Sequence, residues 1–284
     1  RPGAGAAMKT LVHISDLHFG RVDPAVCRDL VTAVWAAKPD LVAVSGDLTQ
    51  RARRAQFAAA RRFLDALPAP RIVVPGNHDV PLYDLFNRFF RPLARFRRLI
   101  SDDLAPFHSD GEIAVAGINT ARSLTFKDGR INARQLALVT ARFATLPAEV
   151  PRIIVVHPPF ESGDLDGDDD IVGRAGMAMD AFARSRVDLV LAGHMHAAGV
   201  VSSARRYRIQ GYAALLIQAG TATSQRLREE PNSFNVIRVQ RPRLELDCMT
   251  FAPGQGFLRS STQAFALGAA GWSPLPPDQR QGAA

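Results

Sequence analysis

Short apolar runs alternate with helical patterns along roughly the first 200 residues of the chain. The runs are rich in valine and isoleucine and apolar at consecutive positions, which is typical of strands covered on both faces. Because helical segments separate them, the pattern predicts an α/β fold. We expect strands at 10–14, 41–44, 72–74, 113–118, 153–156 and 189–192.

Apolar residues at helical spacing mark the segments between these strands. Asp23 and Pro24 form a helix start, and Pro39 ends that helix. Asn132 can cap another helix that runs toward Leu146. The aromatic residues of the expected helices are interpreted as core packing. Further helices are expected over 57–67, over 82–96 with a break near Pro92, and over 178–185.

The pattern changes after Gly199, where helical periodicity fades. Short strand-like stretches follow at 207–209, 215–218, 234–239 and 244–251, and we expect them to form a second sheet. Residues 253–284 are rich in glycine, serine and proline, so we expect a poorly ordered tail that is a candidate for homodimer contacts. Since Met8 resembles a natural start, residues 1–8 are interpreted as a tag or extension, which leaves 9–252 as the folded domain.

The composition is that of a globular protein, with 47% hydrophobic residues. No apolar run approaches the roughly 20 residues of a membrane span, and no secretory pattern precedes the first expected strand. Cys27 and Cys248 are the only cysteines, which argues against a disulfide framework. These features predict a cytoplasmic protein without a transmembrane segment.

The formal charge is +8, and arginine carries almost all of the excess. Many arginines fall between Arg51 and Arg98. We favour solvated helix faces as the explanation, and a surface that attracts polyanions or an acidic membrane is the alternative. Because no separate basic module is evident, we expect no stable nucleic-acid partner.

Polar side chains follow most of the expected strands at their carboxyl ends. In open α/β sheets this edge is where ligands bind. The side chains that would gather there are Asp16, His18, Asp47, Asn77, His157, His194 and His196. Seven nitrogen and oxygen donors exceed the needs of one ion, and two divalent ions about 3.5–4 Å apart would use them well.

Asp47 stands alone after Gly46 and therefore suits a carboxylate that bridges two ions. With no thiolate present, Mn, Fe or Zn are suitable metals, and Co or Ni also fit. Each motif alone also has a purely structural interpretation. Gly46-Asp47 fits a turn, residues 77–79 fit an Asx-turn with a cap, and His157 before two prolines fits a rigid strand exit. Together, these structural interpretations would require that five strands end in Asp, Asn or His at the same sheet edge by coincidence.

In their order along the chain, these motifs resemble the signature blocks of the calcineurin-like metallophosphoesterase superfamily. The blocks are Asp16-x-His18, Gly46-Asp47, Gly76-Asn77-His78-Asp79, His157 and Gly193-His194-x-His196. The stretches "ISDLHFG", "GDLTQ" and "GTATSQRLREEPNSFNVI" further resemble the bacterial class III cyclic-nucleotide phosphodiesterase branch. The resemblance covers about 9–239 and implies a four-layer αββα sandwich of two mixed sheets flanked by helices, with a dimetal site at the carboxyl edge of the strands.

The resemblance also implies a role for each matching residue. It places Asp16, His18, Asp47 and His196 on a first metal, and Asp47, Asn77, His157 and His194 on a second. His78 would be a catalytic non-ligand that contacts the phosphoryl oxygens or protonates the leaving group, with Asn77 also near the substrate. Asp79 would orient His78 or brace the loop. Many relatives carry two adjacent histidines where this chain has Val156-His157.

The function that follows is hydrolysis of cyclic nucleotides or similar small phosphodiesters by a hydroxide that bridges the two ions. A pyrophosphohydrolase like the UDP-diacylglucosamine hydrolases of lipid A synthesis is an alternative, and it would use the Phe-rich segment 82–100 at a membrane. DNA-repair exonucleases share the same blocks, and a scaffold without catalysis is a further alternative. The Asp-rich stretch 164–170 lacks the glycine position of an EF-hand and is interpreted as a solvated loop beside the pocket.

Overall fold

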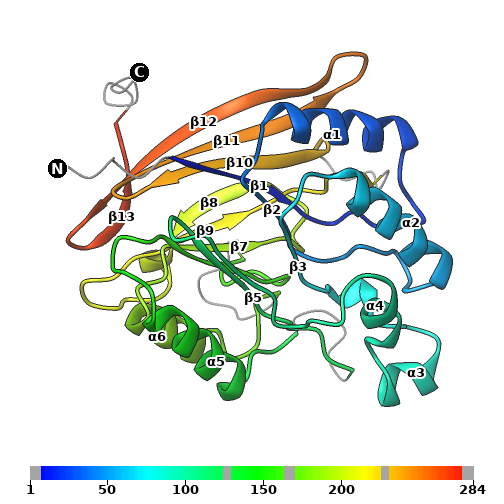
Figure 1. Ribbon diagram of the computed structural model, residues 1–284, viewed down its shortest axis with the longest axis horizontal. Helices are drawn as coiled ribbons and strands as arrows, with labels where there is room; N and C mark the ends of the chain where they lie inside the picture. Colours follow the sequence, from blue (N-terminus) through cyan, green and yellow to red (C-terminus); the bar gives the residue numbers. More distant parts are fainter. Residues whose placement is uncertain (1–7, 124–128, 163–169, 225–229, 277–284) are drawn as a thin grey trace.

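A computed structural model describes residues 8–123, 129–162, 170–224 and 230–276. In these ranges two sheets pack face to face, and helices cover the outer face of each (Figure 1). This arrangement is the predicted αββα sandwich. The chain before Met8 and the stretch 163–169, which held the expected extension and most of the Asp-rich loop, lie outside the described residues.

The first sheet is parallel at one end and antiparallel at the other. Its order is β13-β12-β11-β10-β1-β2-β3, with β1, β2 and β3 parallel and the other neighbouring pairs antiparallel. Its strands are β1 (Lys9–Ile14), β2 (Leu41–Val44), β3 (Arg71–Val73), β10 (Ser233–Gln240), β11 (Arg243–Ala252), β12 (Gly256–Gly268) and β13 (Gly271–Pro274).

The second sheet has a parallel centre between two antiparallel edge strands. Its order is β4-β5-β6-β7-β9-β8, and β4 and β8 are the antiparallel strands. Its strands are β4 (Phe107–Ser109), β5 (Ala114–Gly117), β6 (Arg152–Val155), β7 (Leu189–Ala192), β8 (Gly199–Ser202) and β9 (Leu215–Gln218). Both sheets are therefore mixed, as predicted.

The alternation of side chains along each central strand explains the four layers. On β1, Leu11 faces the space between the sheets, whereas Val12 packs toward the outer helices. On β6, Ile153 lies between the sheets and Ile154 packs toward the other helical layer. Because both faces of each central strand are covered, apolar residues occupy consecutive positions.

Capping residues and amphipathic faces position the long helices. The Asp23 carboxylate accepts a hydrogen bond from Ala25 N–H at the start of α1, and Asn132 accepts one from Gln135 N–H in α5. Both caps were predicted. The helices are α1 (Pro24–Ala36), α2 (Arg54–Ala66), α3 (Leu85–Phe90), α4 (Ala94–Leu99), α5 (Ala133–Ala144) and α6 (Ala175–Arg184), with 3₁₀ turns η1 (Asn77–Asp79) and η2 (Ser203–Arg205). None of the helices in the described ranges has the length and apolarity needed to cross a bilayer.

The interpretation of all aromatic residues in 82–96 as core packing is wrong. The break near Pro92 is confirmed, because α3 ends at Phe90 and α4 begins at Ala94. Phe96 of α4 is buried, but Phe86 and Phe90 of α3 are 63% and 75% exposed. The buried side chain of α3 is Arg88, whose guanidinium donates to the carbonyl of Pro81.

Two short edge strands were not predicted from the sequence, and one expected strand is absent. Strands β4 and β8 lie at opposite edges of the second sheet, where one partner suffices and the apolar signal is weak. Residues 207–209 are not a strand. Tyr207 N–H instead donates to the carbonyl of Ser203, the first residue of η2, and its hydroxyl donates to Phe160 O.

The expectation of a poorly ordered tail after residue 252 is also wrong for 256–274. Strands β12 and β13 extend the first sheet, and Phe265 and Trp272 are buried between the sheets. The middle of β12 is exposed, with small polar side chains such as Ser260 and Ser261, which explains its tail-like composition. Trp272 Nε1 donates to Asp188 Oδ1 at 2.9 Å, which ties β13 to the end of the second sheet.

We predict that Trp272→Ala lowers the free energy of unfolding by about 3–5 kcal/mol, because a large buried side chain and its hydrogen bond are lost. Trp35→Ala is the matched control, since Trp35 is 56% exposed, and we expect about 1 kcal/mol or less. Urea denaturation followed by far-UV circular dichroism measures both. Equal losses would contradict the assignment of 256–274 to the folded core.

Candidate metal centre

The predicted ligands meet where the carboxyl ends of strands from both sheets converge. Asp16 and Asp47 follow β1 and β2 of the first sheet, while His157 and His194 follow β6 and β7 of the second. Hydrogen bonds join the two sheets here. His194 N–H donates to Asp16 Oδ2 at 2.9 Å, and His157 Nδ1 lies 2.8 Å from Ser45 O.

The backbone at this edge is strained. Most of the predicted ligands have a positive φ, a region that costs about 1–3 kcal/mol for a residue other than glycine. Loop hydrogen bonds hold two of them, since Asp16 N–H donates to Gly46 O and His18 N–H to Asp47 O. Such strain persists only where the surrounding structure fixes it, and it gathers at functional sites. The residues and their φ values are Asp16 (54°), His18 (49°), Asp47 (51°), His194 (75°) and His196 (62°).

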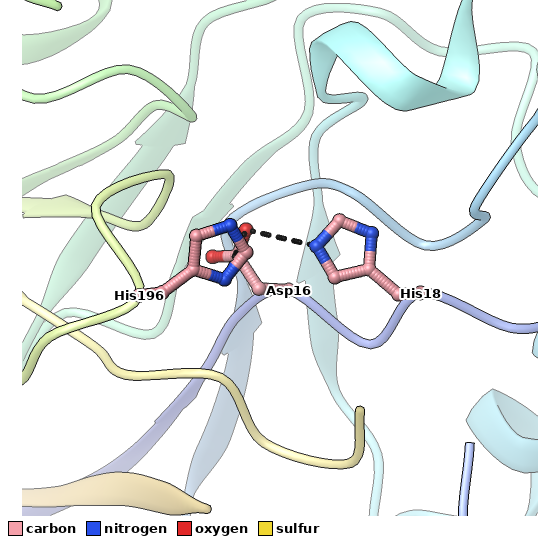
Figure 2. A group of neighbouring side chains, drawn as sticks. All are labelled: Asp16, His18 and His196. Carbon is pink, nitrogen blue, oxygen red and sulfur yellow. Dashed lines mark ion pairs between the residues drawn. The ribbon is translucent and has the colours of Figure 1, made fainter. Parts of the chain in front are cut away.

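Asp16, His18 and His196 form a first group (Figure 2). Asp16 Oδ1 lies 3.5 Å from His18 Nε2 and 3.8 Å from His196 Nδ1. The other oxygen, Oδ2, accepts from Ser15 Oγ at 2.6 Å as well as from His194 N–H. Oδ1 has no hydrogen-bond partner among the described residues, and neither does either ring nitrogen of His18.

Asp47 lies between this group and a second one. Its Oδ1 is 3.3 Å from His157 Nε2, and its Oδ2 is 3.8 Å from His18 Nε2. Oδ1 also accepts from His78 N–H at 2.9 Å. The two oxygens of one buried carboxylate therefore face two separate sets of donors, which is the geometry that a bridging ligand requires.

His157, Asn77 and His194 make up the second group. A carbonyl cannot donate, so His157 Nδ1 must carry a proton toward Ser45 O, and once the ring is neutral its lone pair is on Nε2. That Nε2 lies 3.0 Å from Asn77 Oδ1. The rings of His157 and His194 meet edge to face, with centroids 5.2 Å apart. The structure thus brings all seven predicted ligands together.

His78 approaches the same centre from the more exposed side. Its Nδ1 lies 3.0 Å from the carbonyl of Gln50, and its Nε2 is 3.9 Å from Asp47 Oδ2. The Gln50 contact places a proton on Nδ1 and directs Nε2 inward. The side chain of His78 remains 19% exposed, and Arg51 Nη1 lies 3.4 Å from its Nδ1. Sequence reasoning did not identify either Gln50 or Arg51.

Asp79 braces the loops and does not orient the ring of His78. Its carboxylate accepts from the backbone N–H groups of Leu48, Thr49 and Gly76 at 2.9–3.1 Å, and from the Thr49 hydroxyl at 2.9 Å. These bonds join the loop after β2 to η1. The bracing alternative of the two predicted roles therefore fits the structure.

Two glycines allow the close approach of the loops. Gly46 has φ +94°, and a Cβ there would lie 2.7 Å from His157 Nδ1. A Cβ on Gly193 would lie 1.8 Å from Ser15 Oγ. Any side chain at these positions would push the ligands apart.

Mutual electrostatics set the charge state of the cluster. Burial alone would raise the pKa of Asp16, but the imidazole of His18, 3.5 Å away, and the charges of the nearby histidines hold it below its usual range. Burial would also raise the pKa of Asp47, and His157 outweighs that effect and keeps it low. Burial would lower the pKa of His157, but the charge of Asp47 raises it to about 9. Burial lowers the pKa of His194 to about 4.

These residues fit divalent ions. Buried atoms of Asp16 and His18 have no hydrogen-bond partner among the described residues, although each unmade hydrogen bond is costly. The donors are imidazole nitrogens and carboxylate or amide oxygens, a set that suits borderline divalent metals. A cation would supply the missing partner for each lone pair.

Sequence reasoning missed the residues that hold the ligands. Ser15 Oγ fixes Asp16, the Ser45 carbonyl fixes His157, and Thr221 Oγ1 contacts His196 Nδ1 at 2.5 Å. A backbone carbonyl leaves no signature in sequence. Ser15 and Ser45 follow β1 and β2 directly, and they were visible in sequence as polar residues one and two positions before Asp16 and Asp47.

The chain is similar to known proteins of one family. Residues 9–198 match the family profile described as calcineurin-like phosphoesterase. The glycerophosphodiester phosphodiesterase GpdQ of Enterobacter lignolyticus (strain SCF1) is 29% identical over 170 residues, which cover 56% of this chain and 60% of that protein. A protein named probable cyclic nucleotide phosphodiesterase from Synechococcus sp. is 28% identical over 213 residues, covering 69% of this chain and 76% of the relative. The chain thus spans less than two thirds of the first of these relatives.

Solved structures share the fold. A purple acid phosphatase from yellow lupin seeds superposes with a TM-score of 0.67 at 12% identity, covering 94% of this chain and 55% of that one. A dimetal phosphatase from Danio rerio gives a TM-score of 0.60 at 17% identity, covering 90% and 98%. At these identities the likeness supports the fold alone.

We predict that the affinity of the metal-free protein for Mn²⁺ rises with pH between about pH 7 and pH 9. Below the raised pKa of His157 its imidazolium must release a proton before it can bind a cation, which costs about tenfold in affinity per pH unit. Asp16 and Asp47 are already ionised and release none.

Titration calorimetry in buffers of different ionisation enthalpy measures the protons released. His108→Asn is the control, because His108 lies on the edge strand β4. An affinity that stays constant or falls over this pH range would refute the assigned charge state.

Proposed function

The chain belongs to the calcineurin-like phosphoesterase family, and on that premise we propose that it is a dinuclear metal-dependent phosphodiesterase acting on cyclic nucleotides or similar small diesters. The observation that carries the proposal is the position of Asp47, whose two oxygens face two groups of donors. The names of the curated relatives, a glycerophosphodiester phosphodiesterase and a probable cyclic nucleotide phosphodiesterase, support the substrate class.

In this proposal the two groups of side chains hold two divalent ions. Asp16, His18, Asp47 and His196 would hold one, and Asp47, Asn77, His157 and His194 the other. Bound there, Mn, Fe or Zn would supply Lewis acidity and lower the pKa of a coordinated water. The carboxylates keep the site anionic at neutral pH, and the hydrogen bonds of Ser15, Ser45 and Asp79 fix the ligands before a substrate arrives.

His78 assists the departing oxygen. The Gln50 carbonyl holds its Nδ1–H, so Nε2 is the atom that points to the centre and can carry a proton to the leaving group. Partial exposure lets this proton be replenished from solvent. Arg51, next to His78, offers a fixed positive charge to the non-bridging oxygens or to the substrate beyond the phosphorus.

The alternatives differ in substrate or in catalysis. The lipid pyrophosphohydrolase ranked below the small-diester enzyme because the Phe-rich segment 82–100 resembles ordinary helix packing, and the exposure of Phe86 and Phe90 removes that reason. A scaffold without catalysis is disfavoured because all the expected donors are present and gathered. The cytoplasmic location and the homodimer remain predictions from sequence.

We predict that the purified protein with Mn²⁺ hydrolyses bis-p-nitrophenyl phosphate, and that Asp47→Asn lowers kcat/KM at least about 10³-fold, because a shared ligand of both ions is lost. Asp65→Asn is the control for removing a carboxylate, since Asp65 pairs with Arg61 on α2, away from the centre. Parallel assays with cyclic AMP, glycerophosphodiesters, UDP-diacylglucosamine and single-stranded DNA separate the substrate classes. No turnover with any divalent metal would overturn the proposal.

We predict that His78→Asn reduces hydrolysis of alkyl diesters by about 10²–10⁴-fold, but affects p-nitrophenyl esters much less. An alkoxide needs a proton as it departs, whereas p-nitrophenolate does not. Steady-state kinetics on both substrates, with metal content determined for each variant, measure the difference. Equal losses on both substrates would argue against a general acid at this position.

A further inference from the structure

The outward face of α3 is a compact apolar patch, which we define as Tyr83, Leu85, Phe86, Phe89 and Phe90. Their exposed fractions are 77%, 62%, 63%, 50% and 75%, respectively. Half of the large hydrophobic residues exposed in the described chain therefore lie within this one short segment. A concentration of this kind marks an interaction site, whereas single exposed hydrophobic residues do not.

Polar contacts on the inner side hold the patch in place. The Arg88 guanidinium is buried and donates to Pro81 O, and Asp84 caps α3 through Asn87 N–H. Arg95 of α4 donates to both Asp84 Oδ2 and Ala52 O. The Arg88 side chain thus points inward, whereas the aromatic side chains of the segment are exposed. Figure 1 shows α3 at the periphery of the molecule, beyond α4.

The segment that carries the patch is basic, and two of its exposed arginines, Arg91 and Arg98, have no ion pair in the described residues. Residues 81–100 contain five arginines and one acidic residue, Asp84, which is paired with Arg95. Arg91 and Arg98 are exposed, and they flank the aromatic face in sequence. This combination of aromatic side chains and arginines is complementary to a surface that is apolar inside and anionic outside.

We propose that the patch docks the protein on the surface of an anionic lipid bilayer. The aromatic rings would enter the boundary between headgroups and acyl chains, and Arg91 and Arg98 would bind lipid phosphates. A second copy of the chain is a poorer occupant, because a two-fold contact would bring two basic segments together. Since α3 follows η1 and its residue His78, docking would hold the rim of the metal centre close to the bilayer.

Co-sedimentation with vesicles tests the proposal. We expect the protein to bind phosphatidylcholine vesicles that contain phosphatidylglycerol, to bind pure phosphatidylcholine vesicles much more weakly, and to dissociate as salt rises. Phe86→Ser/Phe90→Ser should weaken binding at least about tenfold. Arg91→Gln/Arg98→Gln should weaken it about fivefold for each charge removed.

Matched controls substitute exposed apolar and basic residues that lie outside the patch. Leu138→Ser/Leu258→Ser removes two exposed apolar side chains from α5 and β12, and Arg28→Gln/Arg184→Gln removes two exposed arginines from α1 and α6. Both should bind like the wild type. The thermal unfolding midpoint verifies that each variant is folded, so the test does not depend on the proposed function.

Three outcomes would overturn the proposal. These are no binding of the wild type to anionic vesicles, equal binding of the Phe86→Ser/Phe90→Ser variant, and a wild-type dimer that this substitution converts to monomer without any vesicle binding. The last result, measured by analytical ultracentrifugation, would assign the patch to a second copy of the chain.

Discussion

The structure depends on the crowding of two buried carboxylates and several imidazoles at the edge where two sheets meet. Asp16 and Asp47 are inaccessible to solvent, and the histidines around them keep their pKa values low, so that both remain charged. Burying such charges is costly unless they are paired. The surrounding serine hydroxyls and backbone groups satisfy one side of each ligand and leave the other side facing the centre. Divalent cations would provide the missing pairing, and the donor atoms of the first group, Asp16, His18 and His196, lie within 4.8 Å of one another.

The strained turns and the packing between the sheets together position these side chains at one edge. Parallel strands from both sheets end at one edge, so residues far apart in the chain need only short turns to converge. Those turns force positive φ values on five ligands, and Gly46 and Gly193 permit the close contact of the loops. Asp79 accepts four hydrogen bonds that hold two of the loops together. The interior between the sheets, which includes the C-terminal Trp272, provides the rigid support for this edge.

The sequence predicted the central strands, the capped helices, the family and the gathering of seven polar side chains at one edge, because each has a local signature. Consecutive Val and Ile residues identify doubly covered strands, and polar residues directly after them identify the ligand edge. The exposed α3 was misread because Phe86 and Phe90 obey helical spacing whether or not a partner covers them. Strand β12 was misread because its middle, residues 258–263, is exposed on both faces, and Ser260 and Ser261 resemble a linker. The roles of the Ser45 and Gln50 carbonyls were beyond prediction, because any residue type offers the same backbone oxygen.

The central claim is that these side chains hold two cations close together with Asp47 between them. Electron paramagnetic resonance of the Mn²⁺-loaded protein tests it most directly, since two manganese ions that share a carboxylate couple magnetically. The account predicts an exchange-coupled signal at two equivalents of Mn²⁺ and its loss in Asp47→Asn. A spectrum of isolated Mn²⁺ ions at saturation would contradict the account.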